Sequence, residues 1–277
     1  MLRVVEFAHR TDTGRQRTAN EDSFFVDSPL FAVADGMGGA QAGEVASRTA
    51  VESIHPGERR DAAPETYLRE IVATANGRIN QLATSDSNLA GMGTTFTVAL
   101  VDEDEVSIAH VGDSRAYRYR DGELTRLTSD HSLVEELRRE GRLTEEQAEE
   151  HPQRSIITRA LGPEPEVEID TMTYRARAGD IYLICSDGLT TMIREPRIAE
   201  ELEGDADLRA TVKALVRAAN EAGGRDNITV VAFRIDEATA EEVAGGETAT
   251  LIGVSAEEAG LDGERIRTAA AAERSKA

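Results

Sequence analysis

The sequence predicts an α+β fold in which a β-sandwich is flanked by helices. Two observations lead to this prediction. Most of the chain alternates short apolar or β-branched runs with turns of the hairpin type, and amphipathic helical stretches are inserted at only a few places. Such sheets and helices become stable by burying their apolar faces against one another in layers. The 277 residues, of which 40% are hydrophobic, are enough for one large domain or two small ones.

Apolar runs predict strands, in chain order, at 4–8, 23–26, 30–34, 95–101, 106–111, 115–120, near 124, 167–174, 180–185 and 228–235. Asp121-Gly122 joins two of them and is among the strongest short hairpin signals. Apolar residues that recur at three and four positions predict helices at 42–54, 68–82 and 208–219. Gly223-Gly224 ends the last of these helices.

Two segments differ from this pattern. Residues 129–151 are charged and have few apolar anchors, which predicts a mobile surface flap. The flap contains two short helix candidates, Ser132 to Glu140 and a second that opens on a capping-box pattern at Thr144. The composition then shifts to Ala, Glu, Gly and Thr. We therefore expect a folded domain at 1–236 and a weakly structured acidic tail at 237–277, whose deletion leaves activity on a small substrate largely intact.

The charge balance and the composition exclude several classes of function. The net charge of −21 argues against binding to nucleic acid or to an anionic membrane. No apolar run is long enough to span a membrane, and the first residues lack the hydrophobic region of a signal peptide. The single cysteine, Cys185, excludes an internal disulfide and fits a reducing compartment. We therefore expect a cytoplasmic protein.

Aspartates recur at the ends of the predicted strands. Asp35, Asp113 and Asp187 follow apolar runs, and Asp226 precedes one. A single Asp-Gly after a strand is typical of an ordinary turn, but strand ends converge at one edge of a sandwich. Asp35, Asp187 and Asp226 then form an all-oxygen site, which suits Mg²⁺ or Mn²⁺ and disfavours Zn²⁺. Without a cation such carboxylates repel and raise one another's pKa values.

Two hard metal ions about 3.5–4 Å apart activate a water molecule and hold phosphoryl oxygens. Arg17 offers the bidentate donor that a phosphate group needs. These residues alone therefore indicate a metal-dependent phosphoester hydrolase.

The motifs also occur in the order of a known family. They are Arg17-Thr18-Ala19-Asn20-Glu21-Asp22, Asp35-Gly36-Met37-Gly38-Gly39, Gly93-Thr94-Thr95, Gly112-Asp113-Ser114-Arg115, Ser186-Asp187-Gly188-Leu189 and Asp226-Asn227-Ile228-Thr229. Over residues 3–235 this ordered set resembles the bacterial metal-dependent protein phosphatases of type 2C, the PPM family. The resemblance implies a four-layer α-β-β-α sandwich of two packed antiparallel sheets. It also implies that a metal-bound water hydrolyses phosphoserine and phosphothreonine in proteins, without a phosphoenzyme.

The resemblance assigns a role to each site residue. It implies that Asp35 bridges two tightly bound metal ions, that the carbonyl of Gly36 binds the second, and that Asp187 and Asp226 hold the first. It further implies that Asp113, with Asp187, binds a third and weaker metal. The remaining roles are the orientation of metal-bound waters by Glu21 and Asp22, phosphate binding by Arg17, and control of substrate access by the flap at 129–151.

Two positions depart from the family pattern. Met37 stands where some members carry a histidine that is thought to protonate the leaving alcohol. Methionine cannot do this, so a metal-bound water is the first candidate for the proton donor. Thr191 stands at the last position of a Ser-Asp-Gly-Leu-Thr-Asp pattern, where we expect an effect on packing or capping and not on metal affinity.

Three alternative functions of the site are considered. A phosphatase of the same fold could act on a small phosphometabolite or on an anti-sigma antagonist. A phosphoprotein-binding scaffold would keep Arg17 but could dispense with Asp35 or Asp187, so the retention of both argues against it. By family, we expect phosphoprotein substrates, a serine/threonine kinase as the counterpart enzyme, and a monomer.

Overall fold

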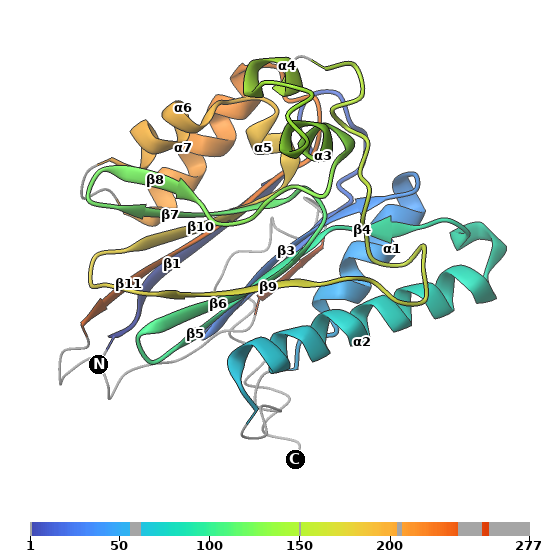
Figure 1. The fold of residues 1–277 in the computed structure, drawn as a ribbon, viewed down its shortest axis with the longest axis horizontal. Helices are drawn as coiled ribbons and strands as arrows, with labels where there is room; N and C mark the ends of the chain where they lie inside the picture. Colours follow the sequence, from blue (N-terminus) through green and yellow to red (C-terminus); the bar gives the residue numbers. More distant parts are fainter. Residues whose placement is uncertain (1, 56–61, 150, 204–206, 238–250, 255–277) are drawn as a thin grey trace.

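Two antiparallel sheets pack face to face, and helices cover their outer faces (Figure 1). The structure is a computed structural model, and it describes all residues except 1, 56–61, 150, 204–206, 238–250 and 255–277. The layers follow one another as helices, sheet, sheet and helices, as the sequence predicted. No helix among the described residues is both long enough and apolar enough to cross a membrane.

The first sheet has β1 at its edge, followed by β11, β10, β7 and β8. These strands are β1 (Leu2–Asp12), β11 (Ile228–Glu237), β10 (Ile181–Cys185), β7 (Arg115–Arg120) and β8 (Glu123–Arg126). The pairing of β1 with β11 runs from Leu2 opposite Glu237 to Asp12 opposite Ile228. This long ladder joins the strand nearest the N-terminus to a strand more than 200 residues later in the chain.

The second sheet has the order β12, β2, β3, β5, β6 and β9, and the short strand β4 pairs with the end of β3. Their bounds are β2 (Asp22–Asp27), β3 (Leu30–Met37), β4 (Gly93–Thr94), β5 (Phe96–Asp102), β6 (Glu105–Val111), β9 (Asp170–Arg175) and β12 (Leu251–Val254). The boundary predicted near residue 236 stays a prediction. One short strand, β12, lies within the predicted tail, and the rest of that tail lies outside the described residues.

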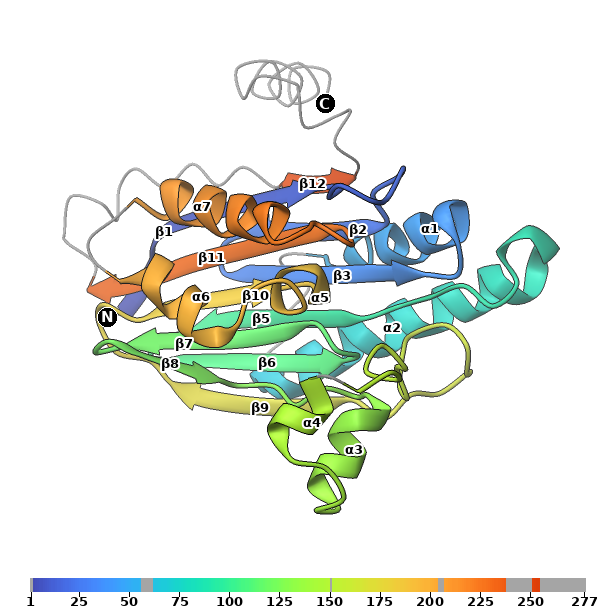
Figure 2. The same ribbon diagram turned by 90° about the horizontal axis from the view of Figure 1, so that it is seen from above.

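Helices cover both outer faces. The second sheet carries α1 (Ala40–Val51) and α2 (Pro64–Ser85), after which comes the short turn η1 (Ser87–Leu89). The first sheet carries α5 (Asp187–Thr190), α6 (Glu195–Leu202) and α7 (Leu208–Glu221), and Figure 2 shows them lying across it. The flap helices α3 (Leu133–Arg139) and α4 (Glu145–Glu149) lie beyond β9, at the edge of the molecule.

Three apolar clusters hold the layers together. Between the sheets, the ring of Phe233 stacks on Phe31 at 4.3 Å and on Tyr182 at 5.3 Å. The helical stripe of α2 packs as its sequence spacing predicted, with Leu68 and Ile79 fully buried. Val212 and Leu215 of α7 are buried in the same way against the first sheet. The strands that carry the site are thus fixed by buried apolar contacts on both faces.

Among the described residues, the α-helices α5 and α6 were not predicted from the sequence. The sequence predicted only that Asp187 follows a strand. In the structure it is also the first residue of the short helix α5. The helix α6 begins at Glu195-Pro196, where proline is favoured because its missing N–H has no partner in a helix's first turn. Its apolar residues are few and it is short, so its periodicity is hard to detect.

Candidate metal centre

Among the described residues, five aspartates at strand ends lie close enough to act on one another through their charges, namely Asp22, Asp35, Asp113, Asp187 and Asp226. Asp22 begins β2 and lies directly opposite Asp35 of β3 in the ladder. Asp113 follows β6, Asp187 follows β10, and Asp226 precedes β11. The antiparallel topology brings these strand ends to the same edge, as the sequence predicted.

The aspartates act on one another through their charge. Burial and the charges of Asp22, Asp187 and other carboxylates hold the pKa of Asp35 well above its usual range. Burial, with added repulsion from neighbouring aspartates, raises the pKa of Asp22 to about 7 and that of Asp187 to about 6. The pKa of Asp113 is also well above its usual range because of burial and the charge of Asp187. This end of the sandwich therefore favours positive charge.

Two buried carboxylate oxygens in this cluster, Oδ1 of Asp22 and Oδ1 of Asp113, have no hydrogen-bond partner among the residues that the structure describes. A buried polar atom without a partner is costly unless something else satisfies it. Within the described residues, no three His, Cys, Asp or Glu side chains are already grouped as a closed metal site. The carboxylates are thus coupled by charge without forming a complete coordination shell. Oxygen donors and the unsatisfied atoms fit a hard divalent cation such as Mn²⁺ or Mg²⁺.

The backbone at Asp35 and Gly36 is held in place from several sides. The hydroxyl of Thr95 accepts from the N–H of Asp35 at 2.9 Å, and the N–H of Thr95 donates to the Asp35 carbonyl, also at 2.9 Å. The N–H of Gly36 donates to the Glu21 carbonyl at 3.2 Å. A Cβ at Gly36 would lie 2.2 Å from the carbonyl oxygen of Gly43, so only glycine fits here. These contacts fix the position of the Gly36 carbonyl.

Glu21 and Asp22 are positioned by residues that are distant in sequence. Oγ of Ser186 donates to Oδ2 of Asp22 at 2.8 Å, and the same Oγ accepts from the N–H of Thr229 at 2.9 Å. The side chain of Asn227 accepts from the N–H of Glu21 at 2.8 Å. Burial raises the pKa of Glu21. Both acids are therefore held in the site by the two motifs that also carry Asp187 and Asp226.

Arg17 lies at the open side of the cluster. Its Nη2 donates to Oδ2 of Asp226 at 2.7 Å, and this hydrogen bond raises the pKa of Arg17. The Arg17 side chain is 49% exposed, so part of the guanidinium still faces solvent. An arginine in this position can bind a phosphate group that approaches the carboxylates from outside.

One acidic residue near the site was missed by the sequence analysis. Asp130 is nearly buried and is bound by Nη2 of Arg115 at 2.8 Å and by Arg126. Its negative charge helps raise the pKa of both Asp113 and Asp187. Asp130 lies in the segment that we expected to be a mobile flap. The buried Leu127 and Thr128 just before it are a signal that could have placed it in the interior.

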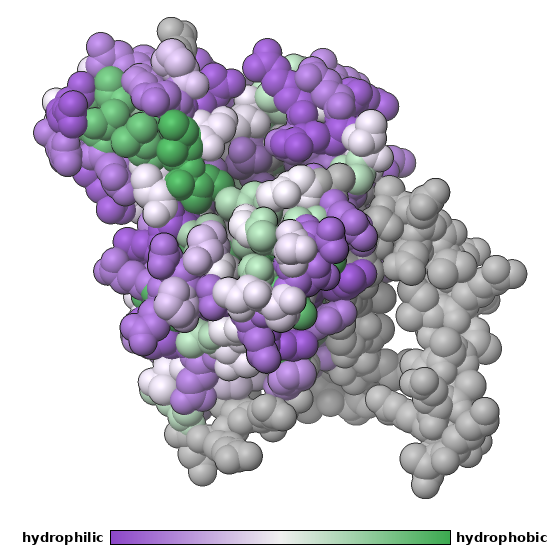
Figure 3. Space-filling view, turned by 90° about the vertical axis from the view of Figure 1, so that its right-hand side faces the viewer, coloured by the Kyte–Doolittle hydropathy of each residue, from purple (hydrophilic) through white to green (hydrophobic). Residues whose placement is uncertain are grey.

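The start of the flap is therefore part of the protein interior. Nδ1 of His131 accepts from the N–H of Gly112 at 3.0 Å, and the N–H of His131 donates to the Gly112 carbonyl at 2.7 Å. Ser132 is buried and accepts from Glu135 at the N-terminus of α3. The outer part is exposed, and Figure 3 shows an apolar patch where α3 and α4 lie. Ile156, whose carbonyl accepts from the first residue of α3, is 44% exposed.

Comparison with known proteins then identifies the family. The family model described as Protein phosphatase 2C matches residues 12–231. The chain belongs to the protein phosphatase 2C family. The matched range contains every site residue that the sequence analysis proposed.

Two relatives from bacteria illustrate the similarity. The serine/threonine phosphatase stp of Listeria monocytogenes is 42% identical over 238 residues, which cover 82% of this chain and 94% of that protein. The serine/threonine protein phosphatase PstP of Mycobacterium tuberculosis is also 42% identical, over 231 residues that cover 82% of this chain and 44% of PstP.

Solved structures agree with this family assignment. The crystal structure of the Mycobacterium tuberculosis phosphatase PstP superposes with a TM-score of 0.78 at 40% identity, covering 85% of this chain and 99% of that chain. A structure of the PstP catalytic domain in complex with two manganese ions superposes with a TM-score of 0.78 at 37% identity, covering 86% and 100%. The resemblance that the six ordered motifs predicted, and the fold it implied, are thus confirmed.

Proposed function

We propose that this protein phosphatase 2C homologue hydrolyses phosphoserine and phosphothreonine in proteins at a centre of two divalent metal ions. The observation that carries the proposal is the cluster of buried aspartates with unpartnered oxygens beside a half-exposed arginine. The related PstP structure with two manganese ions supports the same number of metals. Asp35, the Gly36 carbonyl, Asp187 and Asp226 are the proposed ligands.

Divalent metal ions at such a site supply a nucleophilic water at neutral pH and neutralise phosphoryl oxygens. The protein's own residues then have separate tasks. Arg17 orients the phosphate through its guanidinium, part of which faces solvent. Glu21 and Asp22 accept hydrogen bonds from water in the site, and the free Oδ1 of Asp22 is available for this. Met37 has no proton to give, so the leaving alcohol takes its proton from water.

The finer details of the metal centre are also proposals. We assign a third, weaker site to Asp113 and Asp187, because Oδ1 of Asp113 is buried without a partner. The hard oxygen donors suit both Mn²⁺ and Mg²⁺, and we propose Mn²⁺ as the activating ion in vitro. We further propose a monomeric, cytoplasmic enzyme that opposes a serine/threonine kinase, in keeping with its single, buried and free Cys185.

Hydrolysis of p-nitrophenyl phosphate tests the chemistry. We expect activity with Mn²⁺, loss of activity with EDTA, and loss of activity in Asp35→Asn because a central ligand is removed. Asp121→Asn is the matched control, since Asp121 lies exposed in a hairpin with a left-handed backbone (φ 52°) that asparagine also adopts. Full activity of the chelated protein would contradict the metal mechanism.

A comparison of substrates tests the substrate class. We expect phosphothreonine and phosphoserine peptides to be hydrolysed with a higher kcat/KM than small phosphometabolites such as sugar phosphates. The reverse order would favour the small-molecule alternative. A protein that binds phosphopeptides but hydrolyses neither class would favour a scaffold.

A further inference from the structure

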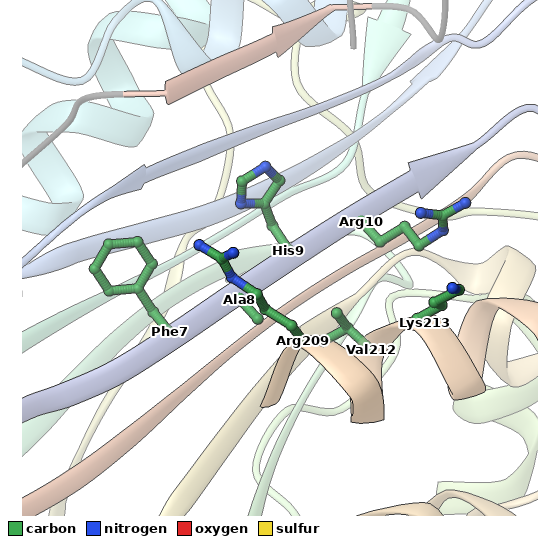
Figure 4. A pocket seen from close by; sticks show the side chains of 7 residues that line it. All are labelled: Phe7, Ala8, His9, Arg10, Arg209, Val212 and Lys213. Carbon is green, nitrogen blue, oxygen red and sulfur yellow. The ribbon is translucent and has the colours of Figure 1, made fainter. Parts of the chain in front are cut away.

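A cavity lies apart from the aspartate cluster, between the edge strand β1 and helix α7 (Figure 4). Its volume is about 390 Å³, and it is lined by Phe7, Ala8, His9, Arg10, Arg209, Val212 and Lys213. Protein pockets that enclose small ligands or several side chains begin at roughly 300 Å³. The cavity is therefore too large for a bare phosphate ion and large enough for a side chain with its neighbours.

The cavity is positively charged although the chain carries a net charge of −21. Arg10, Arg209 and Lys213 line it, and none of the lining residues is acidic. Within the described part of the chain, no carboxylate forms an ion pair with any of these three cations. Glu6 on the same strand is engaged elsewhere, because it accepts from the N–H of Leu208 at 2.7 Å. The three positive charges thus remain available to an anion.

The cavity also offers apolar surface and a neutral donor. Figure 4 shows Arg209 reaching from α7 across β1 towards His9, with Phe7 beside it. The His9 ring lies 4.5 Å from the Phe24 ring, and burial together with the Arg209 charge lowers the pKa of His9 to about 4. A neutral imidazole can donate one hydrogen bond to an anion. The lining suits an acidic group attached to an apolar stem.

The cavity is close enough to the aspartates for one substrate segment to reach both. Arg10 lies opposite Val230 in the ladder, four residues along the chain from Asp226. At about 3.3 Å per extended residue this corresponds to roughly 13 Å. A segment that places its phosphate at Arg17 needs about four or more further residues to enter the cavity.

We propose that this cavity binds a second acidic group of the substrate phosphoprotein, either a phosphorylated or a carboxylate side chain about four or more residues from the phosphate that is removed. The proposal rests on the proposed function, since it concerns substrates of the same enzyme. It defines a substrate class: phosphoproteins with separated acidic groups in an extended segment. Charge complementarity between this segment and the cations Arg10, Arg209 and Lys213, which have no carboxylate partner among the described residues, provides the recognition.

Chemical labelling of lysine tests the proposal without catalysis. Lys213 and Lys276 are the two lysines of the chain, so amine labelling followed by mass spectrometry reports on the cavity directly. The probe is a ten-residue peptide that carries a phosphonate analogue of phosphothreonine, which cannot be hydrolysed, and two glutamates six residues away, and it is added to the Mn²⁺-loaded protein. We expect the peptide to protect Lys213 and to leave Lys276 unprotected. Equal labelling of Lys213 with and without the peptide would overturn the proposal.

Two controls separate the possible ligands. A peptide with glutamine in place of the two glutamates should bind about tenfold more weakly, the effect expected for losing a charged hydrogen bond. Protection of Lys213 by inorganic phosphate at the same concentration would make the cavity a free-phosphate site and contradict the proposal. Because no turnover is needed, failure here is distinct from absence of phosphatase activity.

Variants complete the test. Arg209→Ala and Lys213→Ala should each remove most of the tenfold preference for the glutamate peptide in fluorescence anisotropy. Arg217→Ala is the matched control, because Arg217 lies on the same helix, is exposed, and faces Glu221 at 3.8 Å instead of the cavity. An unchanged preference in both cavity variants would contradict the assignment. A loss of preference in the control would show a nonspecific charge effect and would also contradict it.

Discussion

Nη2 of Arg17 donates a hydrogen bond of 2.7 Å to Oδ2 of Asp226, which joins the proposed phosphate-binding residue to a proposed metal ligand. The two side chains are 49% and 32% exposed, so solvent screens the pair and it adds little to stability. The arginine is thus placed where it can exchange a carboxylate partner for a phosphate oxygen.

We expect Arg17→Lys to lower kcat/KM for p-nitrophenyl phosphate about 10- to 100-fold, the effect of losing one charged hydrogen bond of a bidentate pair. The urea midpoint should stay the same, because the ion pair is exposed. Arg15→Lys is the control, since Arg15 is an exposed residue of the same loop. An unchanged kcat/KM in Arg17→Lys would contradict the assignment of Arg17 to phosphate binding.

Local patterns predicted most elements of this fold, although not α5 and α6, because the signals lie within a few residues. The capping box at the start of α4 is an example. The N–H of Thr144 donates to Gln147 at 2.9 Å, and the N–H of Gln147 donates to the Thr144 hydroxyl at 3.3 Å. The strand-end aspartates Asp35, Asp113 and Asp187 were equally predictable, because each of them comes within two residues of the end of an apolar run.

Contacts between distant residues could not be predicted in this way. Ser186 donates to Asp22 across 164 positions of sequence, and no local pattern indicates that partnership. Asp130 was assigned to a mobile flap because its neighbours are charged, whereas Arg115 holds it in the interior. The cationic cavity likewise combines Arg10 with Lys213, which come from opposite ends of the domain.

If Asp113 belongs to a third metal site, its loss should lower turnover without preventing the binding of the other two metal ions. We expect Asp113→Ala to lower kcat while two Mn²⁺ ions per chain still bind in isothermal titration calorimetry, because Asp35, Asp187 and Asp226 remain. Asp104→Ala is a control, since Asp104 lies in an exposed hairpin and pairs with Arg175. Loss of all metal binding in Asp113→Ala would refute the assignment of Asp113 to a separate site.

The hydroxyl of Ser186 connects Asp22 to the first sheet by donating to Asp22 and accepting from Thr229. Ser186→Ala removes both of these buried contacts. We expect the free energy of unfolding to fall by about 1–3 kcal/mol in urea titrations. Ser85→Ala is the control, because Ser85 is exposed at the end of α2 and should change stability by less than about 0.5 kcal/mol. An equal change in the free energy of unfolding in both variants would show that the buried Ser186 hydroxyl does not contribute to stability.

The raised pKa values of Asp22 and Asp187, about 7 and about 6, predict how the stability of the metal-free protein depends on pH. Their unfolded values are about 3.9, so the folded protein binds protons that the unfolded chain does not bind between about pH 4 and 7. Stability must therefore rise as the pH falls through this window. Asp130, whose pKa is lowered by its arginine partners, acts in the opposite direction only at lower pH.

We expect the Tm of the EDTA-treated protein to rise by a few degrees between pH 8 and pH 5.5. Saturating Mn²⁺ should remove this rise or reverse it, because the cation stabilises the charged carboxylates. Asp22→Asn should flatten the metal-free profile, since one of the buried carboxyl groups whose pKa is raised is lost, whereas Asp121→Asn should not. A metal-free Tm that falls steadily over this range would mean that the aspartates are not coupled as their burial and proximity require.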